Sequence, residues 1–416
     1  MKFQKLYIII VLLLFTIIII YPFSTLSVVN EKNPKNSKIA GYNLKQGILI
    51  RFEGNYTLIH KELIPRNYYF KLSDIDTCSP HSLYTPNTPP YQEINITENK
   101  IIGNDTTIHH TIDKFNNSYN LFNTTLNLNE KVMIVQNYTI KLNAISFDQI
   151  NNSNIGEYEP KNEIFALFCN KTEKYFEIDN LGLINASNNI VGSSTNPIEK
   201  AKKIYNWIGK NINYDGSLSE EKGALWAFLN KKGDCSEFSD LMITLLRIQG
   251  IPARKITGIV LSSNSNFQPY VGQKITFTAN KETQDFLGHA WIEYYVPNIG
   301  WIACDPTWNQ PNGAYFNNID FYHIGFNVGA WFSYPGLSSE LSEFPYIPSP
   351  ATSIYSDYSF DYNVTITILK TNFTNFDIFP IFILVVIICS VIILLIIIIT
   401  IIIRSRKRLS KRKYYC

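Results

Sequence analysis

The sequence Gly-Asp-Cys-Ser-Glu-Phe at residues 233–238 decides the local fold, because it carries the signals of a helix start. Asp234 and Glu237 have the spacing of a capping box, in which the two side chains accept free backbone N–H groups. Apolar residues then recur with the spacing of one helix face, at Phe238, Leu241, Met242, Leu245 and Leu246. Gly250 is typical of the residue that ends a helix. We therefore expect a helix with Cys235 in its first turn.

This position favours ionisation of the Cys235 thiol. The unpaired N–H groups of a first turn and the helix dipole stabilise a negative charge, so we expect a pKa below the usual value of about 8.5. A lone cysteine is more often a small buried apolar residue. The catalytic interpretation therefore depends on partners elsewhere in the chain.

Two later segments supply candidate partners. One run of aromatic and β-branched residues begins at His289, and a second begins at Trp301 and ends at Asp305. Residues 297–300 between them have the composition of a turn, which predicts a β-hairpin. If Asp305 lies opposite Trp291, His289 is its diagonal neighbour on the same face, whereas a one-residue slip would separate them. A thiol, a histidine and an aspartate are the groups of a nucleophilic triad.

In order, spacing and flanking residues, these segments resemble the core of the transglutaminase-like superfamily over roughly residues 194–307. The family's Gly-Asp-Cys motif corresponds to Cys235, its His-Ala-Trp motif to His289, and its Trp-x-x-x-Asp-Pro-Thr motif to Asp305. The resemblance implies nucleophile, base and acid, respectively. It also implies an α+β, papain-like arrangement, in which a helix carrying the cysteine packs on an antiparallel sheet carrying the other two residues.

The resemblance implies a thiol enzyme that acts on amide or isopeptide bonds through an acyl-thioester. Hydrolysis and transamidation both stay open, on envelope or surface peptides or proteins. The backbone N–H of Cys235 is one expected oxyanion donor. Tyr214 and Trp226 are candidates for the second, although Tyr214 could instead pack the helix against the sheet. The alternative is a non-catalytic surface adhesion or assembly protein that uses the fold as a binding module.

Apolar segments flank this region. Residues 6–23 follow Lys2 and Lys5, and we expect residues 1–23 to be a signal anchor or a signal peptide. The uncharged run 378–403 exceeds the roughly 20 residues needed to span a membrane.

The charge distribution predicts the orientation. Seven basic residues in the tail at 404–416 follow the second run, so we expect this tail in the cytoplasm and residues 24–377 outside the cell. The basic pI of about 8.3 therefore reflects a membrane anchor, and we expect no nucleic-acid partner.

We expect three parts in the exterior region. The sequence predicts an irregular β-rich, sandwich-like domain at residues 24–189. It predicts the catalytic domain at residues 190–344 and a stalk at residues 345–377. Sequons support an exterior location, although a chain rich in Asn, Ser and Thr contains many by chance. They lie at Asn55, Asn95, Asn104, Asn116, Asn123, Asn137, Asn151, Asn170, Asn185, Asn363 and Asn372.

The remaining cysteines and histidines predict little chemistry. Cys78 and Cys169 could pair, Cys304 could be a core thiol or half of a disulfide, and we assign His323 to a loop or to the core. No Cys/His spacing matches a zinc motif and no acidic cluster matches a calcium loop, so we expect no metal and no cofactor, and activity that is insensitive to a chelator.

Overall fold

The computed structural model describes residues 41–371 with internal gaps, together with residues 390 and 401–402. The gaps are 75–88, 104–107, 113–114, 116, 148–149, 171, 219, 265–266, 284, 309–313, 330–348 and 352–356. The predicted membrane segments at 1–23 and 378–403 and the basic tail therefore lie outside the described residues, apart from those three positions. Within the described part, no helix is long and apolar enough to cross a membrane.

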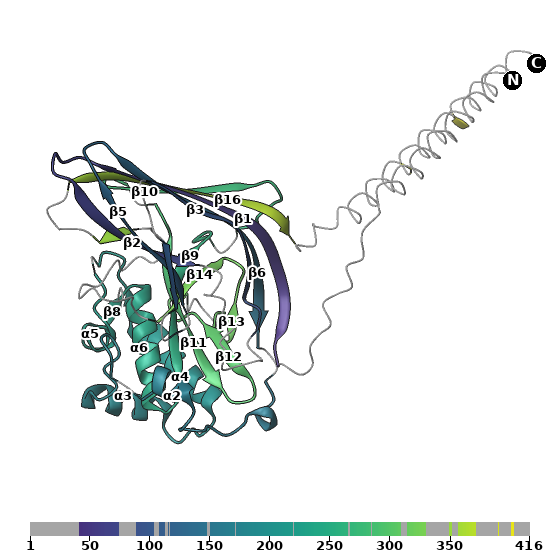
Figure 1. The fold of residues 1–416 in the computed structure, drawn as a ribbon. Helices are drawn as coiled ribbons and strands as arrows, with labels where there is room; N and C mark the ends of the chain where they lie inside the picture. Colours follow the sequence, from purple (N-terminus) through teal and green to yellow (C-terminus); the bar gives the residue numbers. More distant parts are fainter. Residues whose placement is uncertain are drawn as a thin grey trace, which may run out of the picture.

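A long, curved antiparallel sheet covers one side of the molecule (Figure 1). Its strand order is β10-β16-β1-β6-β13, and β3 also pairs with β6. These strands are β1 (Asn43–His60), β3 (Gln92–Ile102), β6 (Lys131–Ser146), β10 (Lys274–Asn280), β13 (Asn318–Ile319) and β16 (Tyr358–Thr371). Alternate residues of β1, including Ile50 and Phe52, are buried, which is the pattern of a strand with one face in the core.

The predicted stalk is wrong for its described C-terminal part. Residues 358–371 form β16, which lies between β1 and β10 and pairs with both. Val364, Ile366 and Ile368 are buried at every second position, and a polar residue lies between each of them and the next. This period of two is the signature of a half-buried strand, whereas a stalk has no core to face.

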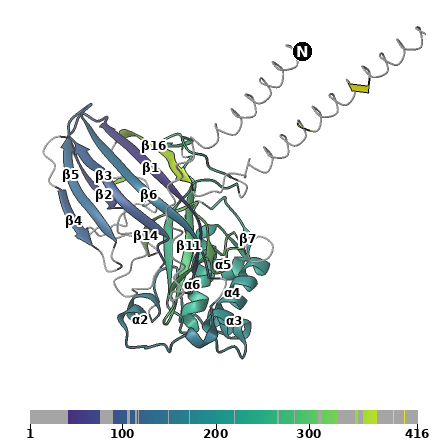
Figure 2. The ribbon, with the colours of Figure 1, turned by 90° about the vertical axis from the view of Figure 1, so that its right-hand side faces the viewer.

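A second sheet packs on the first (Figure 2). Its order is β15-β2-β5-β4, formed by β2 (Arg66–Asp74), β4 (Ile108–Ile112), β5 (Ser118–Leu126) and β15 (Ser349–Ala351). The rings of Tyr56 on β1 and Phe70 on β2 meet edge to face with their centres 6.0 Å apart. Phe70 also stacks on Phe122, with 4.7 Å between the ring centres. Aromatic residues thus form the core between the two sheets, as in a sandwich.

The third sheet carries the predicted histidine and pairs in the order β12-β11-β9-β14. Its strands are β9 (Ala253–Val260), β11 (Gly288–Val296), β12 (Gly300–Cys304) and β14 (His323–Val328). The helices and short elements that accompany it are η2 (Asn152–Asn154), α2 (Glu163–Phe168), α3 (Leu181–Val191), α4 (Pro197–Asn211), α5 (Ala224–Asn230), α6 (Cys235–Ile248), β7 (Asn213–Tyr214) and β8 (Lys232–Gly233). Helix α6 packs against β11 and β9, which is the expected α+β arrangement.

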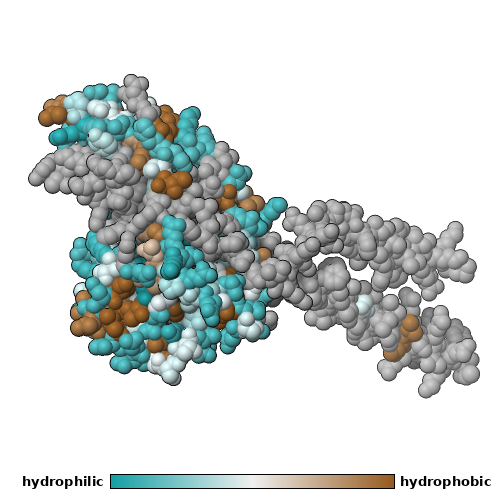
Figure 3. All heavy atoms as spheres, turned by 60° about the horizontal axis from the view of Figure 1, so that its bottom comes forward, coloured by the Kyte–Doolittle hydropathy of each residue, from teal (hydrophilic) through white to brown (hydrophobic). Residues whose placement is uncertain are grey.

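The helices lie at the end of the molecule that Figure 3 brings forward. That surface is mostly hydrophilic, with interspersed apolar patches. Helix α3 begins at Leu181, ahead of the expected boundary at residue 190, and Ser187 donates a hydrogen bond to the Leu245 carbonyl of α6. The helical layer therefore extends into the region expected to be β-rich.

Two buried amide side chains from the N-terminal region fasten the third sheet. Gln92 donates to the Gly325 carbonyl at 2.9 Å and accepts from the Gly325 N–H at 3.0 Å. Asn117 makes the same paired contact with Val328, at 2.7 and 2.8 Å. Such paired bonds fix both the position and the direction of the β14 backbone. The regions expected to be separate domains thus share an interface of specific hydrogen bonds.

A buried ion cluster joins α6 to the sheet. Lys255 on β9 lies 3.1 Å from Asp240 of α6 and 2.7 Å from Glu221, and its side chain is 1% exposed. A charge this deep is stable only when it is paired. The cluster therefore ties the helix that carries Cys235 to the strand beside the histidine.

We predict that Lys255→Met lowers the free energy of unfolding by about 3–5 kcal/mol, because it leaves Asp240 as an uncompensated buried charge. Chemical denaturation of the full chain measures the change. The control is Lys141→Met, which breaks a pair with Glu93 whose side chains are 49% and 45% exposed and should cost less than about 1 kcal/mol. Equal losses in the two variants would contradict this account.

Candidate active site

Helix α6 begins at Cys235, as predicted, and its start is fixed by a complete capping box. Asp234 accepts the Ser236 N–H at 2.8 Å, and the fully buried Glu237 accepts the Asp234 N–H at 3.0 Å. A Cβ at Gly233 would lie 2.3 Å from the Glu237 Cβ, so only glycine fits before the cap. The Gly-Asp-Cys sequence thus places the thiol among the free N–H groups of the first turn.

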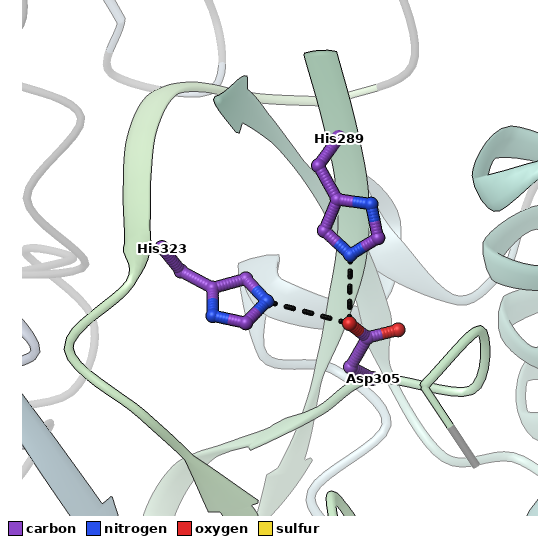
Figure 4. A group of neighbouring side chains, drawn as sticks. All are labelled: His289, Asp305 and His323. Carbon is purple, nitrogen blue, oxygen red and sulfur yellow. Dashed lines mark hydrogen bonds and ion pairs between the residues drawn. The ribbon is translucent and has the colours of Figure 1, made fainter. Parts of the chain in front are cut away.

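The hairpin has the register that the sequence predicted. Ile292 pairs with Cys304, and continuing this register places Asp305 opposite Trp291. His289 Nε2 and Asp305 Oδ2 lie 2.7 Å apart. Figure 4 shows both side chains directed toward each other.

Asp305 is fully buried and accepts four hydrogen bonds. Its Oδ2 faces His289 at 2.7 Å and His323 at 3.3 Å, while its Oδ1 accepts the N–H groups of Thr307 at 2.8 Å and Trp308 at 3.3 Å. Burial alone would raise the pKa of Asp305, but the charges and hydrogen bonds of His289 and His323 hold it well below its ordinary value. The carboxylate is therefore a fixed negative charge behind His289.

The Cys235 thiol interacts with the imidazole of His289 through charge and hydrogen bonding. Burial by itself lowers the pKa of His289, but Asp305 and then Cys235, through charge and hydrogen bonding, raise it to about 9. Because Nε2 of His289 faces Asp305, Nδ1 is the nitrogen left for the half-buried Cys235. The structure thus brings the three predicted residues together in the order thiol, imidazole, carboxylate.

His323 is the residue that the sequence interpretation missed. The sequence predicts a loop or core position for it, and the buried residue opens β14 with Nε2 3.3 Å from Asp305 (Figure 4). Its Nδ1 lies 2.8 Å from Asp320. Sequence position gave no indication, because β14 reaches the site by pairing with β9, outside the hairpin. The spacing of Asp320 and His323, three residues apart, is the signal that could have identified the pair.

Aromatic rings surround the two histidines. Measured between ring centres, Trp308 stacks on His289 at 5.0 Å and lies 4.8 Å from His323. The centre of the Trp291 ring lies 4.9 Å from that of His323. Aromatic faces attract cations and exclude water. These rings favour the protonated imidazoles that the carboxylates already stabilise.

The structure distinguishes the two oxyanion candidates. Tyr214 on β7 pairs with Gly233 on β8, two residues before Cys235. It is 64% exposed, and its ring centre lies 6.5 Å from that of Phe238 on α6. Burial and then the charges of Cys235 and Asp234 raise the pKa of Tyr214, so its hydroxyl keeps the proton that it would donate. Trp226 lies on α5, where the Lys232 Nζ is 5.9 Å from its ring centre. Tyr214 is thus the candidate that a strand pairing holds beside the nucleophile.

The other described cysteines are free and buried. Cys169 donates to the Arg247 carbonyl at 3.6 Å, and burial raises its pKa to about 11. Cys304 is a core thiol whose pKa burial raises well above its ordinary value. The proposed pairing of Cys169 with Cys78 is therefore not formed, and Cys78 itself lies outside the described residues.

Among the described residues, one compact group combines ligand-type side chains, namely His289, Asp305 and His323, whose nitrogen and oxygen atoms lie within 4.8 Å of one another. Both imidazole Nε2 atoms approach the same carboxylate oxygen at hydrogen-bond distance. The arrangement is that of donors around an acceptor.

We predict that Asp305→Asn lowers the pH at which Cys235 loses reactivity toward iodoacetate. This reagent is an anion, so the His289 imidazolium accelerates its attack, and the rate should fall as pH rises through about 9. Removing the Asp305 charge should move this alkaline limb down by roughly 1–3 pH units. The control is Asp361→Asn, at an exposed position of β16. An unchanged limb in Asp305→Asn would refute the assignment.

Comparison with known proteins finds a family match over the segment that carries these three residues. The model of the transglutaminase-like superfamily matches residues 184–306. An uncharacterized protein from Haemophilus influenzae is 31% identical over 122 residues, which are 28% of this chain and 33% of that protein. A protein-glutamine gamma-glutamyltransferase from Pseudomonas aeruginosa is 33% identical over 82 residues, 20% of this chain and 11% of that protein.

A solved structure of a candidate cysteine protease from Cytophaga hutchinsonii is 19% identical, covers 80% of this chain and 94% of its own, and has a TM-score of 0.49. The chain spans about a third or less of the length of the curated relatives that it matches. The family model covers α6 and the hairpin, with Cys235, His289 and Asp305 inside it. Residues 184–306 are therefore a domain of the transglutaminase-like superfamily.

Proposed function

We propose that this protein is a thiol enzyme in which Cys235 attacks amide or isopeptide carbonyls of peptides or proteins. The observation that carries the proposal is the 2.7 Å contact of His289 with the buried Asp305, with Cys235 acting on the same imidazole. A nucleophile, a base and an orienting group within hydrogen-bond reach are what this chemistry requires.

The first half of the reaction forms an acyl-thioester. The Cys235 thiolate attacks the carbonyl carbon, and the developing oxyanion accepts hydrogen bonds from the Cys235 N–H and the Tyr214 hydroxyl. The C–N bond then breaks, and the amine leaves with the proton of the His289 imidazolium. Asp305 stabilises the imidazolium before this transfer and keeps Nδ1 directed at the thiol.

The second half releases the acyl group. His289, now neutral, takes a proton from water or from an amine, which attacks the thioester carbon. The C–S bond breaks and regenerates the thiolate and the imidazolium. Water gives hydrolysis and an amine gives transamidation, so the acceptor decides which activity is expressed. We favour remodelling of cross-links in envelope or surface peptides.

We also propose that the enzyme is membrane-anchored, with the catalytic domain outside the cell and the basic tail inside. The two apolar runs, the basic tail and the sequons support this placement.

The alternative is a non-catalytic binding module, which does not require a thiol beside a histidine that a buried carboxylate holds in place. Burying a carboxylate and two histidines is costly unless the charges are paired, and here both histidines pair with Asp305 while His289 also interacts with the Cys235 thiol. Perturbed groups that converge in this way are typical of catalytic sites. The geometry therefore favours the enzyme.

We predict that the full chain forms an acyl-thioester at Cys235 when treated with an activated acyl ester such as p-nitrophenyl acetate. Mass mapping locates the acyl group. Cys235→Ala should abolish it, and His289→Gln should slow its formation by about 10²–10⁴-fold. Release measured with and without added glycine ester distinguishes a water acceptor from an amine acceptor.

The control is Cys304→Ala, which removes a buried thiol outside the proposed chemistry. It should acylate like the wild type. Acylation of Cys235→Ala at the wild-type rate would overturn the proposed function and leave the binding module as the better account.

A further inference from the structure

His323 is held between two carboxylates. Its Nε2 lies 3.3 Å from Asp305 Oδ2, and its Nδ1 lies 2.8 Å from Asp320 Oδ1. Both neighbours are acceptors, and a neutral imidazole has only one N–H to donate. Only the protonated ring satisfies both contacts. His323 therefore sits in the site as a cation.

Its outer partner is itself fixed. Asp320 accepts the Tyr322 N–H at 2.8 Å with Oδ1 and the Tyr315 hydroxyl at 2.6 Å with Oδ2. These bonds orient the carboxylate toward His323. Behind the ring, a small cavity is lined by His323, Asp320 and Glu293, and Glu293 is already paired with Arg254 at 2.6 Å.

The strand that carries His323 cannot move freely. The paired hydrogen bonds of Gln92 and Asn117 fix β14 at Gly325 and Val328. The His323 ring is enclosed by the rings of Trp291 and Trp308. The position of the imidazole is thus determined by the strand and by its packing.

We propose that His323 is a positioning residue of the thiol site, a second imidazolium that holds Asp305 from behind and balances its charge, with Asp320 as its own support. The proposal rests on the function proposed above. Without His323, Oδ2 of Asp305 would have His289 as its one side-chain donor and would present its full charge to that ring. With His323 in place, Oδ2 is shared between two imidazoles, which limits how strongly the base is held as a cation.

The charges around His323 determine whether its loss raises or lowers the pKa of His289. Burial lowers its pKa, but the Asp320 charge and the hydrogen bonds to Asp305 and Asp320 raise it to about 9, so it is charged at neutral pH. His289 lies with its ring centre 5.4 Å away. Two like charges at this distance oppose each other. Removing the charge of His323 should therefore raise the pKa of His289.

The test uses the pH dependence of iodoacetate alkylation at Cys235 in the full chain. We predict that His323→Gln moves the alkaline limb upward by about one pH unit, because the charge is lost. His323→Phe should show the same upward shift and also lower the plateau rate about tenfold, because the second imidazole donor to Asp305 Oδ2 is lost. The glutamine amide can donate one hydrogen bond, so His323→Gln should recover most of the plateau rate.

The direction of the shift separates positioning from mere structural damage. A disrupted site would free His289 toward its ordinary pKa and move the limb down. The matched control is His60→Gln, a fully buried histidine on β1 that bonds Tyr68 and the Ile64 carbonyl. Thermal unfolding of each variant confirms that it is folded at the assay temperature.

The outcomes are distinct. If Cys235 of the wild type reacts no faster than an ordinary thiol, the proposed function fails and this inference fails with it. If the wild type is reactive but both His323 variants keep its limb and plateau within the change seen for His60→Gln, only the role of His323 is refuted. A downward limb in His323→Gln also refutes it.

Discussion

The buried carboxylate of Asp305 is the charge on which the rest of the site depends. A carboxylate with no exposed surface is stable only if donors surround it, and two backbone N–H groups and two imidazoles do so. The same bonds that stabilise Asp305 aim His289 at the thiol. The hydrogen bonds that compensate for the burial of Asp305 are therefore also the ones that determine the geometry of the site.

This constraint reaches beyond the segment that matches the transglutaminase-like family. His323 and Asp320 follow that segment, and β14 is fastened by Gln92 and Asn117, which precede it by many residues. The N-terminal strands thus do more than extend the molecule, since they set the position of the strand behind the acid. A fragment limited to residues 184–306 would lack three of the four groups that donate to Asp305, namely His323 and the N–H groups of Thr307 and Trp308.

The sequence predicted what local periodicity and turns determine. The α6 start, the capping box, and the hairpin register that brings His289 to Asp305 were all readable, because each depends on residues within a few positions. The strand β16, the role of His323 and the exposure of Tyr214 depend on pairings across the chain. The partner of a strand leaves no local signature, whereas the alternation of residues 358–371 is local and is the signal that distinguishes β16 from a stalk.

The most direct test of the account is the rate of iodoacetate alkylation at Cys235 in the full chain at neutral pH, compared between wild type and His289→Gln. The account predicts a faster reaction in the wild type, because the charged His289 imidazole lies beside the thiol and attracts the anionic reagent. Equal rates in the two proteins would contradict the pairing of thiol and imidazole and with it the proposed chemistry.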